Sequence, residues 1–160
     1  MADALGFEIG GVLYEQLPAI DDRSLYGDRF IETPEVDSAF DALRELASCF
    51  GERRYGIVTC GPETEERIRA WLASRDFVRR AEIPEGNLHF CRKAPHKVST
   101  CKALGLSHMV DDSFPDLLAL RSIRTRFLFR GKMHEMRRHM LSLKHVTCVT
   151  TWNEILAHLR

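Results

Sequence analysis

Short apolar runs alternate with helical stretches along the chain, and this alternation limits the folds that it can adopt. A short apolar run bounded by turn residues is typical of a buried strand, whereas apolar residues at every third or fourth position are typical of an amphipathic helix. Strands are predicted within residues 5–13, 55–59, 109–110, 126–129 and 146–149. Because strands and helices alternate, we predict an α/β protein with a three-layer α/β/α Rossmann-like fold and a mostly parallel central sheet.

Capping and turn residues mark where the helices should begin. Thr33 and Pro34 are typical of a helix start, and an apolar face follows from Val36 to Ala47. Thr151 and Glu154 have the spacing of a capping box at the start of a last helix. Further helices should follow the turns at residues 60–63, 91–97 and 113–116, whereas residues 77–90 predict two short extended pieces around a turn.

Composition excludes several classes of function. The 160 residues are 44% hydrophobic, which suits a single domain spanning 1–160 with its own core and no separate cap domain. Lys plus Arg and Asp plus Glu both number 23, so no global charge favours nucleic acid or a membrane surface. The five cysteines are scattered without a CxxC pair, which favours reduced thiols in the cytoplasm. We also expect no signal peptide and no membrane span.

Carboxylates gather where two of the predicted strands end. Glu8 follows the first apolar run and precedes Gly10, and Asp111, Asp112 and Asp116 follow the run at 109–110. Ligands of open α/β sheets bind at the carboxyl ends of strands. Carboxylates this close repel one another unless a cation lies between them, and Mg²⁺ binds one or two of them with waters and substrate oxygens. The pattern predicts a magnesium site; the simpler alternative is that Asp116 or Ser113 only caps the next helix.

A second group of residues has the chemistry of an anion site. Thr59 ends a predicted strand, and Cys60 and Gly61 lead into a helix whose first N–H groups lack intrahelical partners. A simpler interpretation is that Thr59 only caps that helix. Lys97 lies in the first turn of another predicted helix, where the helix dipole disfavours a cation, so a functional role is indicated. Lys93 is the alternative lysine for that role.

Other constellations are weaker. The spacing of His89, Cys91, His96 and Cys101 matches no usual zinc pair, and no nucleotide-binding glycine motif or nucleophile elbow is present. Residues 14–33 are either an ordered loop over the site or a solvated connection, the latter being the commoner case. The basic stretch 131–143 reads as a solvated helix face or, less commonly, as a docking surface for an acidic partner.

Four of these stretches, in this order and at these strand ends, resemble the haloacid dehalogenase-like hydrolase superfamily, in a capless form. The stretches are 8–12, Thr59, Lys97 and 111–116. The resemblance implies that Glu8 attacks phosphorus and also binds Mg²⁺. It further implies that the Gly10 carbonyl, Asp111 and Asp112 are metal ligands and that Asp116 supports them.

The resemblance also assigns the phosphate-binding residues. Thr59, Cys60 and Gly61 would hold the phosphoryl oxygens, and Lys97 would neutralise charge on the nucleophile and the phosphoryl group.

Two positions depart from the pattern of this family. The family has Asp where this chain has Glu8, and a second Asp, the usual general acid, where it has Gly10. We therefore predict a Mg²⁺-dependent hydrolase or phosphatase of a small phosphorylated metabolite, with weak activity. The alternative is a catalytically inactive relative that binds a phosphorylated ligand or a protein partner. Hydrolysis of another bond, such as carbon–halogen, is a third possibility.

Overall fold

The computed structural model describes residues 2–160, which build one six-stranded parallel sheet. The strand order is β3-β2-β1-β4-β5-β6, and every neighbouring pair is parallel. The predicted Rossmann-like α/β fold is therefore confirmed. The strands are β1 (Leu5–Phe7), β2 (Arg54–Thr59), β3 (Leu88–Cys91), β4 (His108–Asp111), β5 (Thr125–Phe129) and β6 (Thr147–Val149).

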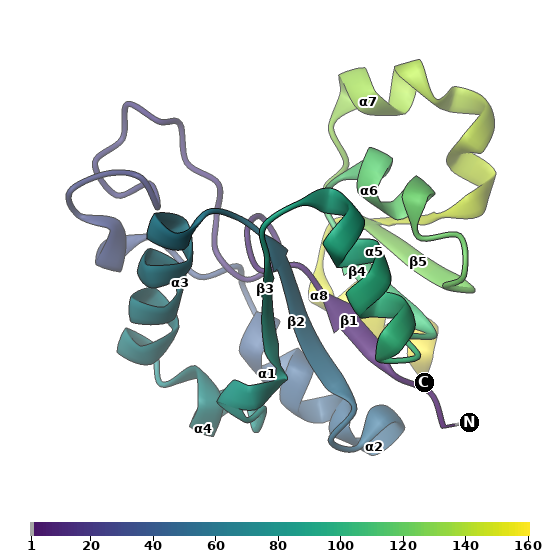
Figure 1. The fold of residues 1–160 in the computed structure, drawn as a ribbon, viewed down its shortest axis with the longest axis horizontal. Helices are drawn as coiled ribbons and strands as arrows, with labels where there is room; N and C mark the ends of the chain where they lie inside the picture. The colour runs from purple at the N-terminus through teal and green to yellow at the C-terminus, as the bar shows by residue number, and fades with distance from the viewer. Residues whose placement is uncertain (1) are drawn as a thin grey trace.

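Helices cover both faces of this sheet. In Figure 1, α5 and α6 lie in front of the strands and α1 lies behind them. The α-helices are α1 (Ala39–Glu45), α2 (Ala47–Phe50), α3 (Pro62–Ser74), α4 (Phe77–Ala81), α5 (Ala94–Ala103), α6 (Phe114–Ala119), α7 (Met133–Arg138) and α8 (Trp152–Leu159). Three short 3₁₀ helices are η1 (Phe30–Glu32), η2 (Glu85–Asn87) and η3 (Met140–His145).

Alternating side chains divide the core into two halves. Val58 and Val110 face the half formed with α1, α3, α4 and α8, whereas their neighbours Ile57 and Met109 face the half formed with α5 and α6. Successive side chains of a strand point to opposite faces, so a strand buried on both faces is apolar throughout. This explains why the short strand sequences show continuous apolar runs rather than alternation.

The strand order places the carboxyl end of β1 at the centre of the molecule. From β1 the chain builds outward to β2 and β3, and it then returns to β4 on the other side of β1. The order reverses at β1, and such a reversal opens a crevice at the carboxyl ends of the strands in which ligands of α/β proteins bind.

Two predicted local structures are wrong. The helix predicted from Thr33 begins only at Ala39, because Glu35 pairs with Tyr14 in an isolated bridge and Ser38 has a φ of 62°. The Thr33 side chain is buried, and its hydroxyl donates to the Arg23 and Phe30 carbonyls instead of capping a helix. Residues 77–90 hold the helix α4 as well as an extended piece, β3.

The cap of α8 follows its prediction in part. The Thr151 hydroxyl accepts a hydrogen bond from the Glu154 N–H at 3.2 Å. The Glu154 carboxylate accepts from the N–H of Thr150, one residue before the position that a capping box requires.

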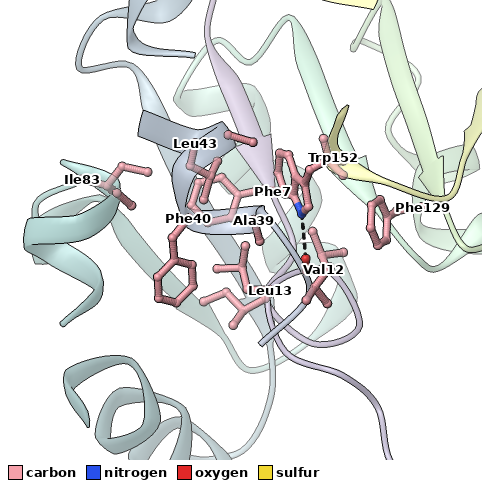
Figure 2. Packing of buried hydrophobic residues seen from close by; sticks show 14 of the residues in the cluster. Phe7, Val12, Leu13, Ala39, Phe40, Leu43, Ile83, Phe129 and Trp152 are labelled. Carbon is pink, nitrogen blue, oxygen red and sulfur yellow. Dashed lines mark hydrogen bonds between the residues drawn. The ribbon is translucent and has the colours of Figure 1, made fainter. Parts of the chain in front are cut away.

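The first loop after β1 is anchored by the last helix. The Trp152 indole N–H donates to the Val12 carbonyl at 2.9 Å, and both residues are fully buried (Figure 2). Figure 2 shows Trp152 reaching Val12 beside Phe129, with Leu13 and Phe40 on the other side of the same apolar layer. This bond fixes the turn that follows Glu8, since the Val12 carbonyl accepts no other hydrogen bond among the described residues.

We predict that Trp152→Phe lowers the free energy of unfolding by about 1–3 kcal/mol, because it leaves a buried carbonyl without a donor. Urea denaturation measures the change. Trp71→Phe is the matched control, because its partner, the Thr33 carbonyl, keeps a hydrogen bond from Arg75 at 2.8 Å. An equal loss in both variants would show that ring volume, and not the bond to Val12, accounts for the effect.

Candidate functional site

A pocket of about 170 Å³ lies at the carboxyl ends of β1, β2 and β4. Glu8 directly follows β1, Thr59 ends β2, and Asp111 ends β4. The structure therefore brings residues separated by about a hundred positions to one site. The lining comprises Glu8, Gly10, Tyr14, Gln16, Tyr26, Val58, Thr59, Cys60, Thr64, Ile68, Asp111, Asp112, Ser113 and Asp116.

The buried side chain of Lys97 forms ion pairs with three of these carboxylates. Lys97 Nζ donates to Glu8 Oε2 at 2.9 Å, Asp111 Oδ2 at 2.7 Å and Asp116 Oδ2 at 3.1 Å. The Lys97 side chain is only 3% exposed. Its three N–H groups therefore have three acceptors, and the surrounding negative charge raises the pKa of Lys97 despite burial. Lys97 itself does not line the pocket and borders it through these three carboxylates, so its contact with a phosphoryl group stays a prediction.

The alternative lysine, Lys93, is excluded from this network by its position. It is exposed and precedes α5 as the N-cap residue, whereas Lys97 lies one turn into the helix and is buried. A cation near a helix N-terminus is disfavoured by the helix dipole. The three ion pairs of Lys97 offset this unfavourable interaction with the helix dipole. They explain why a lysine is tolerated near the start of α5.

Asp112 differs from its neighbour Asp111. Both Asp111 oxygens are engaged, one by Lys97 and the other by the Ser113 N–H at 3.0 Å. The Asp112 carboxylate has no hydrogen bond or ion pair with another of residues 2–160, although the residue is only 9% exposed, and Lys132 attracts it only from beyond ion-pair distance. It packs against Gly11, where any Cβ atom would collide with it. Burial, together with the charges of Asp111 and Glu8, raises the pKa of Asp112 to about 7.

Glu8, unlike Asp112, has a partner for each of its carboxylate oxygens. Its Oε1 atom accepts a hydrogen bond from the Ile9 N–H at 2.9 Å, and its Oε2 atom pairs with Lys97. Burial nevertheless raises the pKa of Glu8 to about 7, against the opposing effect of Lys97. Four carboxylates line the pocket and one ammonium group pairs with three of them, so the fully ionised site holds more negative than positive charge.

The side of the pocket formed by β2 and α3 carries uncharged donors. Thr59, Cys60 and Thr64 line it, whereas Gly61 is the N-cap residue of α3 and lies outside the lining. Thr59 makes no cap hydrogen bond to α3, so the simpler capping interpretation is wrong. Burial raises the pKa of the Cys60 thiol, which disfavours the thiolate that nucleophilic catalysis needs.

Residues 14–33 form an ordered loop at this pocket, not merely a solvated connection. The Arg67 side chain of α3 donates to the carbonyls of Leu25 and Gly27, and its guanidinium lies over the Phe30 ring. Figure 1 shows the loop as an arm beside α3. Tyr14 and Tyr26 from this stretch line the pocket, and no sequence motif indicated either residue.

The residues present fit a divalent cation at one place. No group of three His, Cys, Asp or Glu side chains within residues 2–160 is arranged to hold a metal ion. Mg²⁺, however, needs only one or two carboxylates when other oxygens complete its shell. Glu8 and the unpartnered Asp112 supply two carboxylates, and the Gly10 carbonyl accepts no hydrogen bond among the described residues. Lys97 pairs with Glu8, Asp111 and Asp116 alike, so this contact does not separate ligands from supporting residues, and Asp111 stays a predicted ligand.

Comparisons with known proteins add no relative. No family model matches the chain, and no curated protein matches it. The resemblance to the haloacid dehalogenase-like superfamily therefore remains a hypothesis drawn from the motifs. None of the helices described over residues 2–160 is long and apolar enough to cross a membrane. Fold and site geometry consequently carry the functional argument.

We predict that Lys97→Met lowers the free energy of unfolding by about 3–5 kcal/mol near neutral pH, because it leaves buried carboxylates without their cation. The loss should shrink in acid, where these carboxylates are protonated. Chemical denaturation at several pH values measures the effect. Lys93→Met is the matched control and should change stability by less than about 0.5 kcal/mol. Comparable losses in both variants would contradict a buried network centred on Lys97.

We predict that Asp112→Asn stabilises the metal-free protein by about 1–2 kcal/mol above neutral pH. The folded pKa of Asp112 is raised to about 7 from 3.8, so folding favours the protonated form. Stability from this group is present below pH 3.8 and is lost as the pH rises through about 7. Asparagine removes this loss. Thermal unfolding with a chelator, across this pH range, measures the difference.

Asp111→Asn provides the contrast, because it removes a partner of Lys97 and should destabilise the protein. If Asp112→Asn were also destabilising at high pH, the Asp112 carboxylate would have a partner that this structure lacks.

Proposed function

We propose that this protein is a Mg²⁺-dependent hydrolase of a small phosphate monoester, with low turnover. The observation that supports the proposal is that two carboxylates whose pKa is raised by burial, those of Glu8 and Asp112, line one pocket. This pocket lies where the strand order reverses. Such a pocket attracts a divalent cation. The bound cation would in turn attract a phosphoryl group, which four carboxylates alone would repel.

The order of binding follows from these charges. A phosphate dianion that enters the metal-free pocket meets more negative than positive charge, so phosphate should bind only with Mg²⁺. Thr59 and Thr64 offer hydroxyl donors on the β2 side of the pocket, across β1 from β4, the strand that precedes Asp112. Oxygens of the phosphoryl group would therefore lie between the cation and these hydroxyls.

Glu8 is the proposed nucleophile. Its carboxylate oxygen would bond to phosphorus as the bond from phosphorus to the ester oxygen breaks, and water would then hydrolyse the resulting acyl phosphate. The bound Mg²⁺ would supply electrophilic stabilisation of the phosphoryl oxygens. Lys97 holds one oxygen of the Glu8 carboxylate in place and balances its charge.

A second candidate is a protein that binds a phosphorylated ligand without hydrolysing it. The observation that favours it is Gly10, which has no side chain to protonate a leaving group. The loss of a positioned acid typically lowers a rate by about 10²–10⁴-fold. Glu8 adds to this, because the extra methylene relative to Asp moves the carboxylate by about a bond length, and such shifts can cost about a hundredfold.

The test is a panel of phosphate monoesters assayed with Mg²⁺ on the wild type, Glu8→Asp and Asp112→Asn. We expect Glu8→Asp to raise turnover by about tenfold or more, since it restores the shorter reach. Asp112→Asn should abolish turnover and weaken the binding of Mg²⁺ measured by calorimetry. Lys93→Met, which lies outside the pocket, should leave turnover unchanged.

The outcomes separate the candidates. Turnover that survives Asp112→Asn would contradict the metal assignment. If the wild type and Glu8→Asp are both inactive while phosphate binds in the presence of Mg²⁺, the non-catalytic binding protein is the better description. If phosphate does not bind under any of these conditions, both candidates fail.

A further inference from the structure

A second pocket, of about 340 Å³, lies apart from the candidate site and carries an excess of positive charge. Its lining comprises Leu118, Arg121, Arg126, Ser142 and His145, and none of these residues lines the pocket at the carboxyl ends of the strands. Two arginines and a histidine thus line this space without an acidic residue. Like charges that line one small pocket repel one another, so the grouping is unfavourable until an anion joins it.

Three elements bring these residues together on one face of the sheet. Arg126 is the second residue of β5, and it faces the same side as Leu128, toward α5 and α6, because side chains alternate along a strand. Leu118 belongs to α6, whereas Ser142 and His145 lie on η3. The pocket therefore lies between α6 and η3, with Arg126 of β5 in its wall.

The protein compensates the charge of Arg126 only in part. The Nη1 group donates to the Leu117 carbonyl at 2.8 Å, which holds the guanidinium against α6. The Nε atom is buried without a hydrogen-bond partner among residues 2–160. Burial lowers the pKa of Arg126, and no carboxylate among the described residues opposes this effect. The Nη2 group is neither hydrogen-bonded nor among the buried atoms, so it is the group that a ligand can reach.

Arg54 shows how the same chain satisfies an arginine that serves the fold alone. Its guanidinium donates to four backbone carbonyls, and each of its three nitrogen atoms has an acceptor. Buried polar groups are normally hydrogen-bonded in this way. Arg126, with one acceptor and a place in a pocket, keeps donors for a group that is not part of the protein.

The donors that remain match an oxyanion with two negative charges. Guanidinium groups bind phosphate-type oxyanions through paired N–H groups. The side chains of Arg121 and His145 are exposed and form no ion pair within residues 2–160, and Ser142 adds a hydroxyl group. The pocket volume falls within the range of about 300–1,000 Å³ that is typical of small-molecule sites. Leu118 offers an apolar wall to the organic part of such a ligand.

We infer that the pocket between α6 and η3 binds a divalent oxyanion such as phosphate, free or carried by a small molecule, without a metal ion. Arg126 and Arg121 provide the positive charge that Mg²⁺ would have to provide in the pocket of carboxylates. The inference does not rest on the proposed function, because the two pockets share no residue.

The test uses inorganic phosphate as the probe, with a chelator that removes Mg²⁺ and at constant ionic strength. Under these conditions the pocket of carboxylates should not bind phosphate. Calorimetry measures the affinity of the wild type, Arg126→Met and Arg121→Met. Each variant removes a charged donor and should weaken binding by about tenfold or more. Arg138→Met is the matched control, because Arg138 is exposed on α7 and does not line the pocket. It should keep the affinity of the wild type.

The outcomes are decisive for this pocket alone. If the wild type does not bind phosphate in the chelator, or if all three arginine variants bind it equally, the inference fails and the proposed function is unaffected. Because Arg121 is exposed, Arg121→Met keeps the test valid even if Arg126→Met does not fold. Phenyl phosphate then identifies the source of the anion. Tighter binding than inorganic phosphate supports an organic phosphate that contacts Leu118, and equal affinity supports the free anion.

Discussion

The buried ammonium group of Lys97 is the interaction on which the pocket depends. It lies among carboxylates from the turn after β1, from the end of β4 and from α6. Lys97, Glu8 and Asp111 would each be costly to bury alone, because a charge removed from water needs a partner of opposite sign. The lysine provides that partner for three carboxylates at once and so fixes how two strands and two helices meet. The ion pairs that hold these elements together therefore also hold the residues that line the pocket.

This network of ion pairs also leaves one carboxylate of the pocket, that of Asp112, without a counter-ion. Asp112 lies next to Asp111 in sequence, yet it faces the pocket without a partner, while Asp111 is fully engaged. One of two adjacent aspartates thus stabilises the fold and the other remains available to a ligand. Both residues line the pocket, but Lys97 and the Ser113 N–H reach only Asp111.

Much of the fold could be predicted from the sequence, since buried parallel strands leave a strong local pattern. The failures have physical causes. The helix start at Thr33 was displaced because Glu35 pairs with Tyr14, a contact between distant residues. At the site, the magnesium ion that the acidic cluster predicted stays a prediction, and what the sequence did not reveal is that Lys97 itself pairs with Glu8, Asp111 and Asp116. Spacing alone could not show this, nor could it choose between Lys97 and Lys93. Tyr14 was missed for the same reason, because a lone tyrosine in a polar stretch carries no signal until the fold places it beside Gly10.

The bond between Trp152 and Val12 has a consequence for how the pocket folds. It joins two residues with a separation of 140 positions in the sequence, so a long stretch of chain must close before the turn after Glu8 is anchored. Contacts between distant residues form slowly, because the entropy of loop closure is lost before the contact contributes. We therefore expect the helices, whose contacts are local, to form before this turn takes its final geometry.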